Sequence, residues 1–348
     1  MNAQILLKKL LDEGLNEGCY PGAAAAFGMG DHVYAISCTG KISENGANVN
    51  EETRYDMASC SKIIGPTMIA LRALEEGDLI LSDSLERFFS ECPEDKREIT
   101  VRHLMAHTSG IAPAFWLERL TDDPGAAARV ILERPLTAPI GERVQYSCMG
   151  YILLGSILER IYGKQLNVLA QERVFLPLGM KHTGYCPEGG NIAATEVDPI
   201  TGRAFQGVVH DENARFLRGI SGNAGIFSDI VDMTRFARML AQGAKGYLSP
   251  ATFKTAIRCH GEGYDARRGL GFHLAGTPGS FMGDMIPKEA FGHTGFTGTS
   301  VVIDPCSGFF AILLSNRVHP TRNNEKLFRF RRCFHNVLFA WVSQIESQ

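Results

Sequence analysis

Residues 56–67 read DMASCSKIIGPT, a stretch that sets three hydroxyl or thiol side chains directly before a lysine. If the stretch opens a helix, residues three or four apart share one face, whereas immediate neighbours point in different directions. Lys62 is three residues from Ser59, two from Cys60 and one from Ser61. The spacing therefore pairs Lys62 with Ser59.

This pairing suits a particular chemistry. A serine hydroxyl is a poor nucleophile until a base removes its proton, and a lysine acts as a base only if its pKa falls well below about 10.4. Burial and the positive end of a helix both favour the neutral amine, and free N–H groups there can stabilise an oxyanion. Ser59 and Lys62 are thus candidate catalytic residues, although a capping serine followed by a solvated lysine has the same spacing.

The composition is that of an ordinary globular protein. The chain has 348 residues, 45% hydrophobic and 21% charged, so we expect one large unit or two lobes. A net charge of −3 gives no electrostatic case for binding nucleic acid or an anionic membrane. We expect the basic run RFRRCFH, residues 329–335, to be the solvated face of a helix. No apolar run approaches the roughly 20 residues of a membrane span.

Cysteine and histidine usage favours neither disulfides nor metal. The nine cysteines are odd in number and contain no Cys-x-x-Cys, so we expect reduced and mostly buried thiols. The ten histidines are scattered and form no His-Glu-x-x-His. The N-terminal segment resembles an amphipathic helix more than a signal peptide. We therefore expect a cytoplasmic protein without a metal or other cofactor.

Hydrophobic periodicity predicts strands near both ends of the chain and helices between them. Residues 21–40 predict a hairpin turning at Gly30 and Asp31, and Pro66 is expected to kink or restart the helix that begins at Ser59. The other predicted helices are 1–18, Thr100 to Gly110, 149–163, Ser228 to Gly243 and the C-terminal segment, and the other predicted strands are 269–276, 299–305 and 308–316.

This order predicts an α/β (α+β) fold in which the two ends of the chain build one mostly antiparallel sheet. Helices flank the sheet, and a mainly helical lobe is inserted. We expect a single domain over residues 1–348, with a sheet lobe from about 1–58 and 245–348 and a helical lobe from about 59–244. A ligand site is expected between the lobes.

Ser-x-x-Lys is the signature of β-lactamases and penicillin-binding proteins, and the chain resembles that superfamily. The likeness is greatest to its class C branch, which holds class C β-lactamases, D-amino-peptidases and β-lactamase-like carboxylesterases, and it spans nearly the whole chain. The fold expected from the pattern is also the fold that this resemblance implies. The segments that carry it are PGAAAAFGMGDHVYAISCTG, YDMASCSKI, LEEGDLILSDSLERFF, ITVRHLMAHTSGI, VQYSCMGYILLGSILE, FLPLGMKHTGY, VHDENARFLRGISGNAGIFSDIVDMTRFARML and FGHTGFTGTSVVIDP.

The resemblance implies roles for several residues. Ser59 is the nucleophile, and Tyr146 stands where the family has the tyrosine of Tyr-x-Asn, which shares proton transfer with the lysine. A phenol near an ammonium can act as the base that activates a deacylating water. Taken alone, Tyr146 would also fit a half-buried core ring.

HTGFTG matches the Lys-Thr-Gly strand of the family, with His293, Thr294 and Gly295 in place. We expect Gly295 to leave room for substrate beside the strand. The N–H of Phe296 would complete an oxyanion hole with that of Ser59. His293 replaces the lysine, as in several esterases and peptidases of the family, and outside this context it would fit a surface strand.

Two departures from the family pattern bear on the substrate. Cys148 replaces the asparagine that binds the amide of a penicillin or peptide, and a thiol is a poor substitute for an amide. No separate glutamate base for deacylation is evident, so Tyr146 must carry that step. The His-Thr-Ser-Gly of residues 107–110 is expected to be a helix end, and we assign no role to His210 and Asp211, nor redox chemistry to Cys60.

These features together predict a serine hydrolase that forms an acyl-enzyme on Ser59 and acts on small esters or amides. A β-lactamase or a D-alanyl-D-alanine-type peptidase is the main alternative. A non-hydrolytic penicillin-binding sensor or scaffold is a third. The expected partner is a small ester, amide or β-lactam substrate, with no nucleic acid and no membrane.

Overall fold

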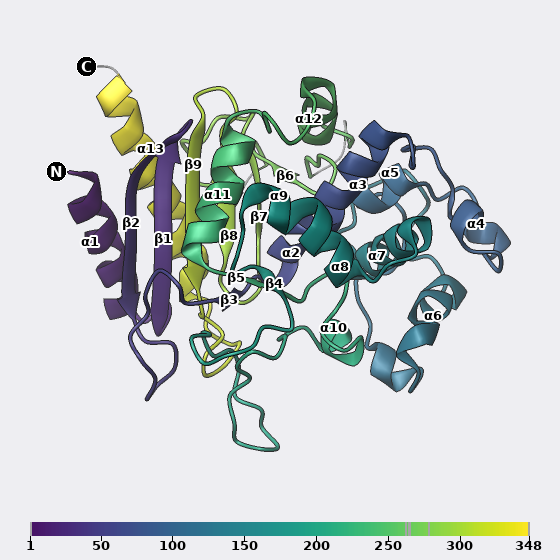
Figure 1. Ribbon diagram of the computed structural model, residues 1–348, viewed down its shortest axis with the longest axis horizontal. Coiled ribbons are helices and arrows are strands. Elements are labelled where there is room, and N and C mark those ends of the chain that lie inside the picture. The colour runs from purple at the N-terminus through teal and green to yellow at the C-terminus, as the bar shows by residue number, and fades with distance from the viewer. Residues whose placement is uncertain (1, 262, 264–265, 278, 347–348) are drawn as a thin grey trace.

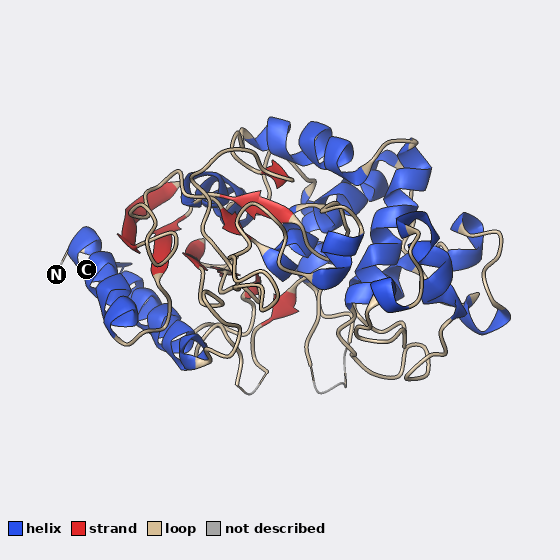
Figure 2. Ribbon diagram, turned by 90° about the horizontal axis from the view of Figure 1, so that it is seen from below, coloured by secondary structure: helices blue, strands red, loops and turns tan. Residues whose placement is uncertain are grey.

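The structure is a computed structural model that describes residues 2–261, 263, 266–277 and 279–346. Within these ranges six antiparallel strands form one sheet, in the order β2-β1-β9-β8-β7-β6, beside a mainly helical lobe (Figures 1 and 2). Its strands are β1 (Gly22–Met29), β2 (His32–Gly40), β6 (His273–Leu274), β7 (Phe291–Thr294), β8 (Ser300–Ile303) and β9 (Phe309–Ser315). The predicted fold class is confirmed.

Helices cover both faces of the sheet and make up most of the second lobe (Figure 1). Their bounds are α1 (Ala3–Asn16), α2 (Ser61–Ile64), α3 (Pro66–Glu76), α4 (Leu85–Phe88), α5 (Val101–Met105), α6 (Ala127–Glu133), α7 (Cys148–Tyr162), α8 (Leu166–Ala170), α9 (Leu176–Leu178), α10 (Glu212–Phe216), α11 (Ile230–Ala241), α12 (Pro250–Ile257) and α13 (Lys326–Glu346). The 3₁₀ turn η1 (Ala58–Cys60) precedes α2, and the π-helical turn η5 (Gln171–Phe175) precedes α9. None of the described helices is both long and apolar enough to cross a bilayer.

Strands β1 and β9 join the two ends of the chain at the centre of the sheet. Ala25 of β1 pairs with Leu313 of β9, and the predicted β1–β2 hairpin turns between Met29 and His32. Alternate side chains of β1 and β9 enter two different hydrophobic clusters, one on each face of the sheet. Burial on both faces explains why these strands are continuous apolar runs instead of alternating ones.

The two faces of the sheet have different covers. α1 and α13 lie together on one face, and α11 packs on the other against β1, β8 and β9 (Figures 1 and 2). Since α11 covers the sheet, it belongs structurally with the strands, although the predicted boundary assigns it to the helical lobe. We retain the two-lobe division itself as a proposal.

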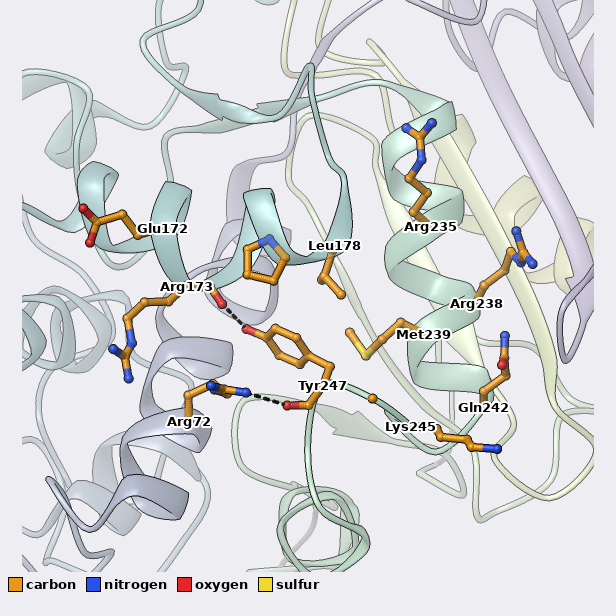
Figure 3. A pocket seen from close by; sticks show the side chains of 12 residues that line it. Arg72, Glu172, Arg173, Leu178, Arg235, Arg238, Met239, Gln242, Lys245 and Tyr247 are labelled. Carbon is orange, nitrogen blue, oxygen red and sulfur yellow. Dashed lines mark hydrogen bonds between the residues drawn. The ribbon is translucent and has the colours of Figure 1, made fainter.

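Tyr247 links two helical elements that are far apart in sequence. Its carbonyl accepts a hydrogen bond from Arg72 of α3 at 3.1 Å, and its hydroxyl donates to the carbonyl of Arg173 in η5 at 2.8 Å (Figure 3). A cavity of about 520 Å³ lies here between α3, η5 and α11, and none of the predicted site residues lines it.

Local sequence signals fixed several helix boundaries. Pro66 restarts the helix as predicted, because α2 ends at Ile64 and α3 begins at Pro66. Thr100 caps α5 as predicted, and it forms a capping box with His103. The predicted ends of two helices were wrong. α5 stops at Met105 and not near Gly110, and Asp229 rather than Ser228 caps α11 by accepting from the Asp232 N–H at 2.8 Å.

Three further expectations are corrected. The strand predicted over 269–276 is reduced to β6, and the basic run is not uniformly solvated, because the Arg331 residue is only 4% exposed. The cysteines are free, but fewer are buried than predicted. Three are buried, three are partly buried, and Cys186, Cys306 and Cys333 are exposed.

A second sheet was not predicted, because its strands are too short to show periodicity. β3 (Tyr55–Asp56) and β4 (Gly184–Tyr185) pair antiparallel with the two sides of β5 (Ile226–Ser228). This sheet holds the chain immediately before η1.

The turn between β7 and β8 docks on the same segment. The Thr297 hydroxyl donates a hydrogen bond to the Asp56 carbonyl at 2.6 Å, and the Thr299 hydroxyl donates one to the Met57 carbonyl at 3.1 Å. A side chain at Gly295 would place Cβ 2.4 Å from the Met57 carbonyl oxygen. Gly295 therefore gives room to the protein's own backbone, and its expected role beside a substrate stays a prediction.

We predict that Gly295→Ala destabilises the protein by about 1–3 kcal/mol, because the added methyl group forces the turn away from Met57. Gly184→Ala is the matched control, since no atom lies within 4 Å of a Cβ added there. Urea unfolding followed by circular dichroism measures both. Equal unfolding midpoints would contradict the close approach.

Candidate active site

An unusual backbone conformation presents Ser59. Ala58, directly before it, has a φ of +44°, which a residue with a side chain rarely adopts. The buried Asp56 carboxylate holds this conformation, because it accepts hydrogen bonds from the Ala58 N–H at 2.8 Å and from the His210 N–H at 2.7 Å. Such strain persists only where the surrounding structure enforces it, and it is frequent at active sites.

The three neighbouring nucleophile candidates point to three different places. The Oγ of Ser59 lies 3.1 Å from the Nζ of Lys62. The thiol of Cys60 meets the Thr299 hydroxyl at 3.5 Å, and burial raises the pKa of this thiol to about 11. The Oγ of Ser61 accepts from the Ile226 N–H of β5 at 3.1 Å. The structure therefore brings only Ser59 to Lys62, as the helix spacing predicts.

Lys62 is fully buried, and protein groups replace the water around its ammonium group. Besides Ser59, its Nζ donates to the Asn223 carbonyl at 2.8 Å and contacts the Cys148 sulfur at 3.5 Å. Burial acts to lower the pKa of Lys62, but Cys148 and Tyr146 raise it more, so the pKa lies above its ordinary value. This direction favours the ammonium ion at Lys62 in the resting site.

Tyr146 stands over the pair. The centroid of its half-buried ring lies 5.0 Å from the Nζ of Lys62. Its hydroxyl is shielded from solvent and makes no hydrogen bond of good geometry among the described residues. Burial raises the pKa of this phenol, and Lys62 and Ser59 oppose the rise without cancelling it. The next residue, Ser147, caps α7 by accepting a hydrogen bond from the Gly150 N–H at 3.0 Å, and this cap fixes the position of Tyr146.

Strand β7 brings His293 and Thr294 to the same place. The ring of His293 lies 6.0 Å from that of Tyr146, and its Nδ1 is 2.7 Å from the Thr294 carbonyl. Burial, together with the charges of Lys62 and Arg268, holds the pKa of His293 well below its usual range. His293 is therefore a neutral group, unlike the lysine that it replaces in the family.

Phe296 follows in the turn that docks beside η1. Its N–H has no acceptor within the described ranges and is free to bind an oxyanion. Its ring is 49% exposed and lies between the His210 ring, stacked at 5.6 Å, and the Arg317 guanidinium, at 4.7 Å. His210 thus borders the site, whereas Asp211 caps α10 through the Ala214 N–H.

A cavity adjoins the site at Thr294. It has a volume of about 660 Å³ and is also lined by Phe281, Phe328 and Arg331. No group of three or more His, Cys, Asp or Glu side chains among the described residues could hold a metal ion. The site is therefore built from a hydroxyl, an amine, a phenol and neutral imidazoles.

Sequence reasoning missed three residues that surround Tyr146. His107, expected only as part of a helix end, lies 4.5 Å from the Tyr146 ring, and its Nδ1 accepts from the Ser147 N–H at 3.2 Å. His273 lies 6.2 Å from the same ring, and the guanidinium carbon of Arg268 lies 5.2 Å from it. No spacing in the sequence signals the last two.

Comparisons with known proteins bear on the family of the chain. A sequence model of the Beta-lactamase family matches residues 7–335. The "Putative D-alanyl-D-alanine carboxypeptidase" of Escherichia coli strain K12 is 29% identical over 328 residues, covering 82% of this chain and 74% of that protein.

Two solved structures share the fold. The octameric penicillin-binding protein homologue from Pyrococcus abyssi has a TM-score of 0.77 and 20% identity, over 96% of this chain and 77% of that one. EstCE1, described as a hydrolase with promiscuous acyltransferase activity, has a TM-score of 0.73 and 21% identity, over 93% and 97%. Since the family match spans nearly the whole chain, the protein belongs to the Beta-lactamase family of serine hydrolases, within the superfamily of β-lactamases and penicillin-binding proteins.

Proposed function

We propose that this protein is an esterase that forms an acyl-enzyme on Ser59 and acts on small esters or amides. The observation that carries the proposal is the 3.1 Å contact between the Ser59 hydroxyl and the Lys62 ammonium beneath the Tyr146 ring. No second hydroxyl or thiol in the DMASCSKIIGPT segment contacts Lys62, because Cys60 and Ser61 point elsewhere.

The proton route follows from the charges. Lys62 is an ammonium ion in the resting site, so the base is the phenolate of Tyr146, which the ammonium stabilises. The phenolate takes the proton of Ser59 as its oxygen attacks the substrate carbonyl, and the Ser59 and Phe296 N–H groups bind the resulting oxyanion. The phenol then protonates the leaving group. In the second half, the Tyr146 phenolate takes a proton from water as the water oxygen attacks the acyl carbonyl. The tetrahedral intermediate then expels the Ser59 oxygen, which takes the proton back from Tyr146, and the acid is released.

The ester preference rests on Cys148. Its sulfur contacts the Lys62 ammonium in the place where the family pattern has an amide. A thiol offers a weak donor and a weak acceptor, so it holds a substrate amide poorly. An ester with a good leaving group does not need that hydrogen bond.

A D-alanyl-type carboxypeptidase is the second candidate. It is favoured by the cavity beside Thr294, where the Nε and Nη2 atoms of the buried Arg331 have no partner among the described residues. A guanidinium suits the terminal carboxylate of a peptide. The similarity to the "Putative D-alanyl-D-alanine carboxypeptidase" of Escherichia coli agrees with this alternative.

The nucleophile assignment predicts that Ser59→Ala lowers kcat at least about a thousandfold on p-nitrophenyl acetate. Cys60→Ala and Ser61→Ala keep most of the activity, because their side chains serve the fold. Ser61→Ala also loses about 1 kcal/mol of stability with its bond to Ile226. Fluorophosphonate labelling followed by mass spectrometry checks the modified residue, and similar losses in all three variants would contradict the assignment.

The ester preference predicts turnover of p-nitrophenyl esters at least about tenfold faster than of D-alanyl amides or a chromogenic cephalosporin. Cys148→Asn should shift the amide-to-ester ratio of kcat/KM up by about tenfold, the effect of one added hydrogen bond. Faster cephalosporin hydrolysis by the wild type would favour a β-lactamase. A stable acyl-Ser59 without turnover would indicate a sensor, and no labelling by penicillin or fluorophosphonate probes would indicate a scaffold.

The phenolate base predicts that kcat/KM rises with pH. Because burial holds the pKa of Tyr146 above its ordinary value of about 10, the active form is scarce at neutral pH and grows as pH increases. The rate on p-nitrophenyl acetate, corrected for spontaneous hydrolysis, should therefore climb between about pH 7 and 10. Tyr146→Phe should remove the rise. A wild-type plateau already reached below pH 7 would argue for another base.

A further inference from the structure

Arg268, outside every predicted site, is a buried cation in the segment before β6. The residue is 6% exposed, and its guanidinium carbon lies 5.2 Å from the centroid of the Tyr146 ring. Its Nε and Nη1 atoms are shielded from solvent and have no hydrogen-bond partner, and it forms no ion pair within the described part of the chain. Buried charges are normally paired, so an unpaired guanidinium here needs an explanation.

Among the described residues, the surroundings of Tyr146 contain a second cation and no carboxylate in contact. The Lys62 ammonium lies 5.0 Å from the same ring centroid. Asp211, whose charge reaches Lys62, is engaged in capping α10. The titratable and charged groups that face the phenol from the elements around it are Lys62 of α2, His107 after α5, Cys148 and Tyr151 of α7, Arg268, His273 of β6 and His293 of β7.

The imidazoles do not change this balance. Burial, aided by the neighbouring cations, holds the pKa values of His107, His273 and His293 well below the usual range, so the three rings are neutral. The Tyr151 hydroxyl is already hydrogen-bonded to Thr67 at 3.0 Å. Two positive charges therefore enclose one ring. The Cys148 sulfur contacts Lys62 at 3.5 Å and helps to offset that charge, whereas the Tyr146 ring faces both cations, so its phenolate is the group placed to balance the pair.

We propose that Arg268 is a positioning residue that acts with Lys62 to hold Tyr146 as a phenolate during catalysis. This proposal rests on the proposed function, in which Tyr146 is the base. A guanidinium keeps its proton and cannot take one from Ser59, so Arg268 acts only through its charge and its place beside the ring. Burial lowers the pKa of Arg268 to about 10, which leaves it charged near neutral pH.

A direct role in binding substrate fits the geometry less well. Two of the three guanidinium nitrogens of Arg268, Nε and Nη1, are closed off from solvent, so the carboxylate of a substrate reaches those two only if the site rearranges. The phenol ring, in contrast, is already in contact distance for a cation–π interaction.

The test compares pH profiles of kcat/KM on p-nitrophenyl acetate, an uncharged substrate, for wild type, Arg268→Met, Arg268→Gln and Arg268→Lys. The Met and Gln variants should move the rising limb of the profile to higher pH by about one unit. At pH 8 this shift lowers kcat/KM about tenfold, and the difference from the wild type shrinks as pH rises. Arg268→Lys keeps the charge and should shift the limb less. Ultraviolet absorbance of the phenolate, with Tyr146→Phe as the blank, should report the same shift.

Arg160→Met is the matched control. It removes an arginine that lies 4.7 Å over the Phe89 ring at the far end of α7 and should leave the profile unchanged. If folded Arg268 variants lost the same fraction of kcat/KM at every pH, the role of Arg268 would be merely structural and the proposal would be overturned. A loss confined to carboxylate-bearing substrates would also overturn it. If Arg268→Met fails to fold, the Gln and Lys variants decide the test. Rising limbs of kcat/KM at the same pH as in the wild type would then overturn the proposal.

Failure of the proposed function looks different. In that case Tyr146→Phe would retain the wild-type profile, whatever the Arg268 variants do. A wild-type rise that Tyr146→Phe abolishes, but that no Arg268 variant moves, overturns the role of Arg268 alone.

Discussion

One buried ammonium ion holds the site together. The Nζ of Lys62 reaches Ser59 on η1, the carbonyl of Asn223 and the sulfur of Cys148, three partners from separate parts of the chain. Removing an ammonium from water is costly unless hydrogen bonds and negative charge replace its hydration. These contacts supply the replacement, and in doing so they fix where the serine, the helix α7 and the loop before β5 lie relative to one another.

The charge on this lysine shapes the chemistry around it. A cation near neutral imidazoles and a phenol favours any negative charge that forms nearby, on the phenol or on a substrate oxygen. His293 leaves β7 uncharged, which is a difference from the family pattern. Among the described residues, the positive charges that face the Tyr146 ring are therefore those of Lys62 and Arg268, and β7 adds none.

Much of the fold followed from short-range patterns. The hairpin of β1 and β2, the restart at Pro66 and the cap at Thr100 each depend on a few adjacent residues, and each is confirmed. The pairing of Lys62 with Ser59 needed only helix geometry. Family motifs, rather than spacing, pointed to Tyr146 and to the turn after β7.

What escaped prediction depends on contacts between distant segments. Arg268 and His273 reach Tyr146 only after β6 has joined the sheet, and no periodicity records that approach. The rise in the Lys62 pKa could not be read from spacing, because it is decided by Cys148 and Tyr146, far away in sequence. The close approach of Gly295 to Met57 was missed for the same reason.

The pairing of β1 with β9 has a consequence for biosynthesis. Strand β1 is translated well before β9, its neighbour in the sheet, because paired residues such as Ala25 and Leu313 are far apart in sequence. Until then, one edge of an alanine-rich strand destined for burial on both faces stays unpaired. Contacts so distant in sequence form slowly. The β1–β2 hairpin therefore exposes an unpaired edge that shielding by a chaperone would protect until β9 is made.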